Sequence, residues 1–236
     1  MLPEIFKLFW KTVERKDKRR INSQTSPTEI EQFCDIQYID DGLWQHRLDV
    51  YSKSGKLSHR PVIIDIHGGG WMYGTKEINK NYCLVLAQKD YVVVNINYRL
   101  APDFSVADQL RDCFFAFKWV STNIEKYGGD LNNVFVTGDS AGGFLAAYSA
   151  LLNSSDKLRK VFGVTESGLE FRACGLTSPV CFMNTHTFQD VYYSRVKGKE
   201  FSESTLRGFE NFDAVLNKGS MPPTFLVTSS GDAVGR

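Results

Sequence analysis

The chain has 236 residues, which is enough for one α/β domain around a single hydrophobic core. Its 28 Lys and Arg residues nearly balance its 27 Asp and Glu residues, so the charge predicts no nucleic-acid partner. No stretch approaches the roughly 20 apolar residues of an integral membrane segment, and 5 cysteines without Cys-x-x-Cys spacing favour a reduced, cytoplasmic setting.

Residues 1–34 predict an N-terminal helix and a linker, with residues 15–28 as the polar linker. We expect the helix to pack on the body of the domain through one apolar stripe, and the alternative is a membrane surface. The residues of this stripe are Leu2, Ile5, Phe6, Phe9, Trp10 and Val13.

Two alternating segments, residues 35–40 and 45–51, predict an antiparallel hairpin joined at Asp41-Gly42. The apolar run from Pro61 to Ile66 predicts the next strand, which leads into the sequence HGGGW at residues 67–71. Because glycine has no Cβ, the backbone N–H groups of this loop are open to a developing negative charge on oxygen, as an oxyanion hole requires.

Further along the chain, residues 77–89 predict a helix, residues 91–97 a β-branched strand, and residues 105–127 a helix that ends at Gly128-Gly129. Strands that alternate with helices predict an α/β fold with a mostly parallel sheet and helices on both faces. The ligand crevice of such a sheet lies at the carboxyl ends of its strands, where the HGGGW segment is placed.

Residues 133–151 predict a short buried strand, an abrupt turn at Ser140 and an Ala-rich helix. Gly138 and Gly142 flank the serine because a strand that runs directly into a helix leaves no room for side chains at these positions. This turn would hold the Ser140 hydroxyl outward as a nucleophile, and the HGGGW loop would complement it. Two alternatives stay open, a helix N-cap serine and a phosphate-binding turn.

Residues 173–178 predict another strand. Residues 179–221 then interleave aromatic with charged residues, and because acids balance bases there, helices packed by one aromatic face are favoured over a nucleic-acid surface. Residues 224–228 predict the last strand, which is followed by Asp232.

With these motifs in place, the chain resembles the α/β-hydrolase superfamily and, within it, the hormone-sensitive-lipase-like esterases. The matching segments are HGGGW at 67–71, YRLAP at 98–102, GDSAGG at 138–143 and PPTFLVTSSGD at 222–232. The resemblance implies a hydrolase core at residues 35–178 and 222–236, a helical cap insertion at 179–221, and a cap-associated segment at 1–34. HGGGW also fits the pattern of kynurenine formamidases, a related branch.

The resemblance further implies roles for individual residues. Ser140 would be the nucleophile and Asp232 the acid that orients a histidine, while the N–H groups of Gly69, Gly70 and Ala141, with help from Gly68, would form the oxyanion hole. The family places its histidine a few tens of residues after the acid, and the sequence ends at Arg236.

None of the four histidines is expected to be the base. His46 and His59 are expected to be exposed, His67 to shape the oxyanion loop, and His186 would reverse the order of the triad. We therefore expect a C-terminally incomplete fold, with residues 224–228 as an exposed apolar edge, and very low activity.

The expected function is hydrolysis of small carboxylic esters through an acyl-enzyme, with an acyl ester as the small-molecule partner and without a cofactor or metal ion. The alternatives are a non-catalytic ligand binder or inactive fragment, and an amidase or peptidase of the same superfamily. The sequence predicts no particular oligomeric state.

Overall fold

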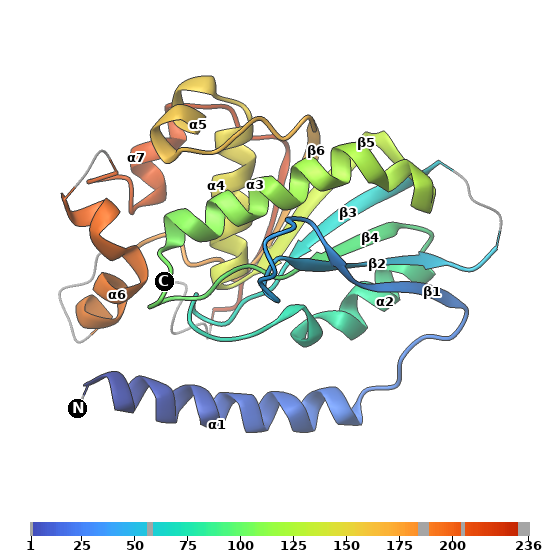
Figure 1. The fold of residues 1–236 in the computed structure, drawn as a ribbon, viewed down its shortest axis with the longest axis horizontal. Helices are drawn as coiled ribbons and strands as arrows, with labels where there is room; N and C mark the ends of the chain where they lie inside the picture. The colour runs from blue at the N-terminus through green and yellow to red at the C-terminus, as the bar shows by residue number, and fades with distance from the viewer. Residues whose placement is uncertain (1, 56–58, 184–188, 204–205, 231–236) are drawn as a thin grey trace.

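The computed structural model describes residues 2–55, 59–183, 189–203 and 206–230 (Figure 1). Within them the fold is built on a 7-stranded sheet with the order β1-β2-β4-β3-β5-β6-β7. β1 and β2 are antiparallel to each other, β2 is antiparallel to β4, and all other neighbours are parallel. The predicted mostly parallel sheet is confirmed. The strands are β1 Ile30–Gln37, β2 Arg47–Lys53, β3 Arg60–Ile66, β4 Val92–Ile96, β5 Gly129–Asp139, β6 Phe171–Thr177 and β7 Thr224–Val227.

The centre of the sheet is apolar on both faces. Every residue of β4, VVVNI, is buried, and its valines pair in register with the isoleucines of β3, for example Val93 with Ile63 and Val94 with Ile64. β-branched side chains pack well on a pleated surface, and a strand covered on both faces needs no alternation with polar residues. The buried strands β3 and β4 therefore hold in place the segments that follow their carboxyl ends.

Helices cover both faces of the sheet. The large core cluster includes side chains of α3 and α4, and a smaller cluster on the α2 side contains Tyr51, Leu84 and Val93. α3 begins at a capping box formed by Ser105 and Asp108. The helices are α1 Leu2–Ser23, α2 Lys80–Gln88, α3 Val106–Asn123, α4 Ala141–Asn153, α5 Asp156–Phe162, α6 Gln189–Glu203 and α7 Phe212–Leu216, with single 3₁₀ turns at Lys76–Ile78 and Ile124–Tyr127.

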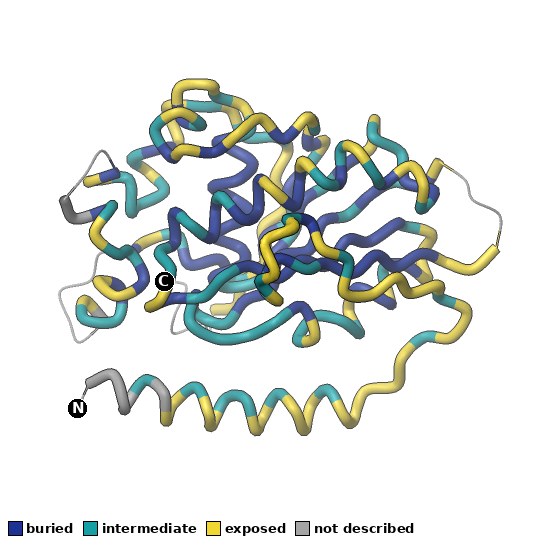
Figure 2. Tube along the Cα trace, in the orientation of Figure 1, coloured by how far each residue is buried: buried dark blue, intermediate teal, exposed yellow. Residues whose placement is uncertain are grey.

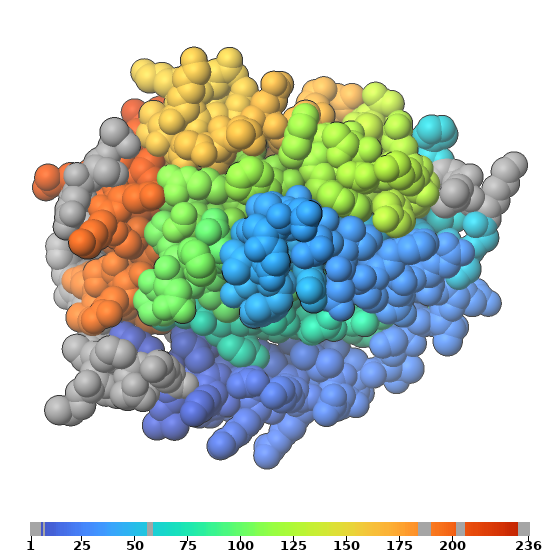
Figure 3. Space-filling model, viewed as in Figure 1, coloured from blue at the N-terminus to red at the C-terminus, as the bar shows by residue number. Residues whose placement is uncertain are grey.

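α1 lies outside the main layers, as a long helix along one edge of the molecule (Figures 1 and 3). It continues to Ser23, so the prediction of a linker from residue 15 was wrong. Ion pairs within the helix, Lys18 with Glu14 and Arg20 with Asp17, stabilise this polar half. Its inner side is half-buried and its outer side is exposed (Figure 2). No helix within the described residues is long and apolar enough to cross a bilayer.

The predicted antiparallel hairpin is confirmed by the pairing of β1 with β2, but its connection and the first crossover helix differ from the prediction. Residues 38–46 connect β1 to β2 in place of a tight Asp41-Gly42 turn, and the Tyr38 amide donates to the His46 carbonyl at 3.0 Å. The helix predicted at 77–89 is a 3₁₀ turn followed by α2. The buried ammonium of Lys76, 2.9 Å from Asp49 and 3.0 Å from Glu77, anchors the beginning of this segment.

The far edge of the sheet is exposed and apolar, as predicted. β7 pairs with β6, yet its side chains Phe225, Leu226 and Val227 are 73%, 57% and 45% exposed. A shallow hollow of about 370 Å³ beside it is lined by Phe135 and Ala173 among others. The described residues therefore leave part of one sheet face open to solvent.

Candidate active site

Ser140 stands at the junction of β5 and α4. Its backbone has φ 51° and ψ −116°, a conformation that residues with a Cβ rarely adopt. The Ser140 amide donates to the carbonyl of Thr177 at 2.9 Å, and its carbonyl accepts from the Phe144 amide at 3.1 Å. The side chain is half-buried, and none of the described residues forms a hydrogen bond with its hydroxyl. The turn thus presents an unengaged hydroxyl at the carboxyl end of a central strand.

The glycines on either side of Ser140 are required by close backbone contacts. A Cβ at Gly142 would overlap the carbonyl oxygen of Ile66, at the end of β3, and a Cβ at Gly138 would overlap the carbonyl of Gly142. The predicted reason for the Gly-x-Ser-x-Gly spacing is confirmed, because backbone atoms of the strand, turn and helix fill the space.

The predicted oxyanion loop, residues 67–71, turns back on itself directly after β3. Gly69 and Gly70 have φ of +113° and +58°, and the amides of Met72 and Tyr73 both return to the Gly69 carbonyl. The Gly68 amide is different, because it donates to Asp139 Oδ1 at 3.0 Å. Gly68 therefore has no free N–H in this structure, which leaves Gly69, Gly70 and Ala141 as the candidate donors.

The nucleophile turn and the oxyanion loop open into one cavity. This cavity, of about 370 Å³, is lined by Ser140, Asp139 and the three glycines 68–70. α1 supplies the opposite wall through four residues, and the remaining lining comes from the segment after the loop. The residues of these walls are Trp10, Val13, Asp17, Arg20, Tyr73, Ile78 and Asn79.

His67 shapes the oxyanion loop and is unsuited to proton transfer. Its Nδ1 donates to the Gly68 carbonyl at 2.7 Å, and its ring stacks on Tyr98 at 4.4 Å. Tyr98 Oη in turn donates to the His67 carbonyl at 2.8 Å. Burial lowers the pKa of His67 to about 4, although the Gly68 bond and the charge of Asp139 act in the opposite direction. The imidazole is thus a neutral, fixed part of the loop.

A carboxylate network behind the two loops was not found from the sequence. Asn79 Nδ2 lies 3.0 Å from Asp65 Oδ2 and 2.9 Å from Asp139 Oδ1, so one amide group joins both acids. Burial raises the pKa of Asp65 to about 7, and the charge of Asp139 adds to this, while bonds from Asn79 and Cys83 oppose it. Through Asp139 the network reaches the Gly68 amide. In the sequence, the only sign of this network is Asp65, a charged residue inside an otherwise apolar strand.

Two helices hold Gly70 from the solvent side. Tyr192 on α6 donates its hydroxyl hydrogen to the Gly70 carbonyl. A Cβ on Gly70 would come within 2.6 Å of Trp10 Cζ2, so the indole of α1 also lies directly over this residue. Phe6 packs edge-on against Tyr192, with ring centroids 5.1 Å apart. The proposed cap segment therefore contacts the candidate oxyanion donors.

The remaining predicted site residues divide into three groups. His59 is exposed, as expected. His46 is buried, which corrects the prediction: its Nδ1 lies 2.6 Å from Asp41 and its Nε2 lies 3.2 Å from Asp112. Burial lowers its pKa, but the two carboxylates outweigh this and raise it. Asp232 and His186 lie outside the described residues, so the role of Asp232 stays a prediction.

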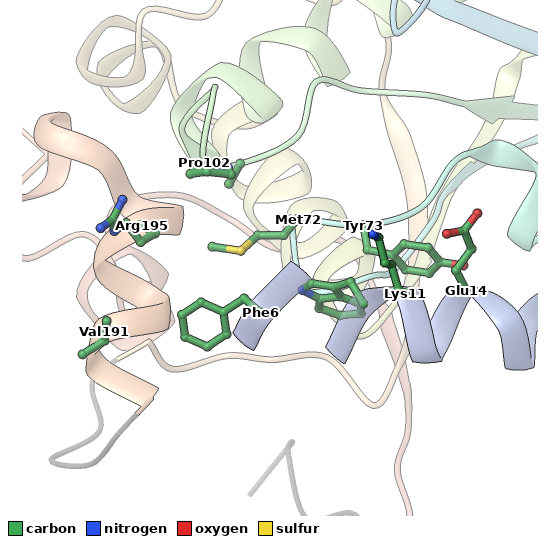
Figure 4. A pocket seen from close by; sticks show the side chains of 10 residues that line it. Phe6, Lys11, Glu14, Met72, Tyr73, Pro102, Val191 and Arg195 are labelled. Carbon is green, nitrogen blue, oxygen red and sulfur yellow. The ribbon is translucent and has the colours of Figure 1, made fainter. Parts of the chain in front are cut away.

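A second cavity, of about 290 Å³, lies beside the first and was also not predicted (Figure 4). It is enclosed by α1, α6 and the segments that follow Trp71 and Leu100. Its walls are mostly apolar and include Phe6, Met72, Ala101, Pro102 and Val191.

Comparisons with known proteins agree with this geometry. The model of the BD-FAE family matches residues 48–197. The structure is similar to that of esterase B from Lactobacillus rhamnosis in complex with a C4-C4 SN3 tributyrin phosphonate, with a TM-score of 0.91, 31% identity, and coverage of 97% of this chain and 74% of that chain.

Two sequence relatives are esterases by name. Isoprenylcysteine alpha-carbonyl methylesterase of Arabidopsis thaliana is 28% identical over 80% of this chain and 46% of its own length. Versiconal hemiacetal acetate esterase of Dothistroma septosporum is 36% identical over 47% of this chain and 33% of its own length. The chain thus spans less than half the length of these curated relatives. By its family match, its fold and these esterase relatives, the chain belongs to the BD-FAE family of the α/β-hydrolase superfamily.

Proposed function

We propose that this chain carries the nucleophile and the oxyanion hole of a serine hydrolase that cleaves small carboxylic esters. The observation that supports this most directly is the shared cavity, in which the unengaged hydroxyl of Ser140 lies with the glycines of the oxyanion loop. The names of the relatives, an acetate esterase and a methylesterase among them, favour esters with small acyl or alcohol groups.

In the proposed reaction, Ser140 Oγ attacks the ester carbonyl carbon and the carbonyl oxygen becomes an oxyanion. The N–H groups of Gly69, Gly70 and Ala141 stabilise this charge by hydrogen bonds. The carbon–oxygen bond to the alcohol then breaks, and the proton from Ser140 leaves with the alcohol. Water attacks the resulting acyl-enzyme and releases the acid.

The proton in these steps needs a base, and the described histidines do not supply one. His67 is held against Tyr98, His46 is held between two carboxylates, and His59 is exposed on the surface. We propose that a histidine oriented by Asp232 completes the triad, and that it belongs to the additional length that the relatives have. Without such a base, subtilisin loses about 10⁶-fold in kcat, so the 236 residues should act very slowly on their own.

The test is covalent labelling with a fluorophosphonate, followed by mass spectrometry of the peptide that contains Ser140, together with hydrolysis of p-nitrophenyl acetate. We expect slow labelling of the 236-residue chain and rapid labelling of a longer form with a downstream histidine. Ser140→Ala should abolish both signals, and Ser194→Ala, an exposed serine on α6, should change neither. An inert longer form would contradict the proposal.

The same assays separate the alternatives. A non-catalytic binder would retain acyl ligands without labelling at Ser140. An amidase or peptidase would cleave aminoacyl amides or formamides faster than p-nitrophenyl esters. We also propose a reducing, cytoplasmic setting, because all five cysteines are free thiols and three of them are buried in the core.

A further inference from the structure

The two cavities beside the oxyanion loop differ in chemistry. The cavity that contains Ser140 has polar groups on its walls, among them Asp17, Arg20 and Asn79. The second cavity is lined mostly by apolar groups such as Phe6, Met72 and Val191, and also by the charged residues Lys11, Glu14 and Arg195 (Figure 4). An alkyl chain gains less in the first cavity, whereas each methylene that leaves water against the apolar walls of the second can strengthen binding by about fourfold.

One pair of aromatic rings separates these cavities. Trp10 and Tyr73 line both of them, and their rings are stacked with centroids 5.2 Å apart and an angle of 14° between the planes. Tyr73 is tied down, because its hydroxyl donates to Asp17 Oδ2 at 3.2 Å. The indole of Trp10 belongs to the peripheral helix α1.

The position of Trp10 lets it act on a substrate. The indole lies directly over Gly70, one of the proposed oxyanion donors. Its helix is exposed on the outer side, where Leu8 and Phe9 are 68% and 56% exposed, so the ring can move without unpacking the core. Because this ring borders both cavities, an alkyl chain that passes from the Ser140 cavity into the second one passes beside it.

We propose that Trp10 determines the chain length of the substrate, by closing the passage between the polar cavity of Ser140 and the apolar second cavity. This inference rests on the proposed ester hydrolysis. With the indole in place an alkyl chain stays in the Ser140 cavity, where polar walls give it less apolar contact. When the indole is absent or turned aside, the second cavity adds room for about ten non-hydrogen atoms, at roughly 30 Å³ each, which corresponds to a medium-length alkyl chain.

The experiment measures the affinity of alkyl methyl ketones, unreactive analogues of methyl esters, from butanone to decanone by calorimetry. In the unmodified chain the affinity should rise only weakly with each added methylene, because the chain stays in the cavity that has Asp17, Arg20 and Asn79 on its walls. In Trp10→Ala it should rise more steeply, by about threefold to fourfold for each added methylene. Leu8→Ala, a truncation of an exposed residue on the same helix that lines neither cavity, should behave like the unmodified chain.

Two further variants test whether the effect of Trp10→Ala comes from the lost ring or from disruption of α1. Trp10→Leu keeps an apolar side chain and should give a smaller gain of the same kind. Trp10→Ala combined with Val191→Trp refills the second cavity from α6 and should lose the gain. An equally steep rise in the unmodified chain and in Trp10→Ala, or no rise in either Trp10 variant, would overturn the proposal. Because ketone binding needs no turnover, a chain that shows this selectivity but never labels at Ser140 would refute the esterase and leave the role of Trp10 standing.

Discussion

The two glycine motifs of the site are held by different parts of the molecule. Around Ser140, the backbone of β3, β5 and α4 fills the space at Gly138 and Gly142. Around Gly70, the neighbours are the ends of side chains, the indole of Trp10 and the hydroxyl of Tyr192, which come from the peripheral helices α1 and α6. The turn at Ser140 is thus fixed by the backbone of the core, whereas Gly70 of the predicted oxyanion loop is held by side chains of the helices over it.

This difference teaches where the site can adapt. Backbone contacts in a close-packed core cannot shift without loss of the fold, because interiors transmit strain and have few voids. Side chains from exposed helices can change rotamer or move with their helix. We therefore expect variation in substrate choice to arise at the oxyanion loop and its cover, while the nucleophile turn stays constant.

The largest expected effect comes from alanine at the two kinds of glycine. Gly142→Ala should lower the free energy of unfolding by at least about 4 kcal/mol, because its Cβ meets backbone that cannot move. Gly70→Ala, with φ +58° and only side-chain ends nearby, should cost about 2 kcal/mol. Gly208→Ala, with φ +86° and open space, gives the cost of backbone strain alone. Urea unfolding measures all three, and equal losses at residues 142 and 70 would contradict the comparison.

A second effect concerns the buried acid that supports both motifs. Because the pKa of Asp65 is about 7 in the folded chain, and near 3.9 in an unfolded one, the folded state holds a proton that the unfolded state has released. Stability should therefore fall as pH rises from about 4 to about 7 and stay low above that. Asp65→Asn should add about 2 kcal/mol at pH 8 and nothing near pH 4.

The same variant isolates the opposite effect of His67. The pKa of His67 is about 4, below its ordinary value, so its contribution is lost as pH falls from about 6.5 to about 4. In Asp65→Asn the loss of stability with rising pH that Asp65 causes should disappear. The loss of stability at acid pH that His67 causes should remain. Asp103→Asn, at an exposed turn, is the matched control for the change of side chain. A gain that is equal at both pH values would mean that Asp65 does not titrate as inferred.

A third effect tests the strain at the nucleophile. Ser140 has φ 51°, which glycine adopts at lower cost than any other residue. Ser140→Gly should therefore be more stable than Ser140→Ala by about 1 kcal/mol, while neither is labelled by the fluorophosphonate. Thermal unfolding of the two variants measures this difference. If alanine were the more stable replacement, the turn would not be under strain.

The smallest expected effect is at the cover of the oxyanion loop. Tyr192→Phe removes the hydrogen bond to the Gly70 carbonyl and should cost about 1 kcal/mol of stability. In a form of the protein that labels at Ser140, labelling should slow severalfold, because Gly70 is less firmly placed. Tyr193→Phe, on the neighbouring ring that packs against Trp71, is the control. Unchanged labelling in Tyr192→Phe would show that this contact from α6 does not help to place Gly70 for the proposed oxyanion hole.

Several features could be predicted from sequence because they depend on neighbours along the chain. The strand, the Gly-x-Ser-x-Gly turn and the helix around Ser140 follow from residues 133–151, and the structure has them as β5, the strained turn and α4. Local sequence likewise predicts the apolar strands β3 and β4 and the exposed edge at β7. The roles of Asp232 and of the missing histidine base stay predictions, because the described residues contain neither.

By itself, then, the sequence determined the order of strands and helices and the serine at a sharp bend, since these depend on local periodicity and on the absence of a Cβ at glycine. The tertiary structure decided which donors and side chains are free. Asp139 occupies the Gly68 amide, Asp112 from the distant helix α3 pairs with the buried His46, and α1 brings Trp10 over Gly70. These features arise from contacts between residues far apart in the chain, and no local pattern encodes such pairings.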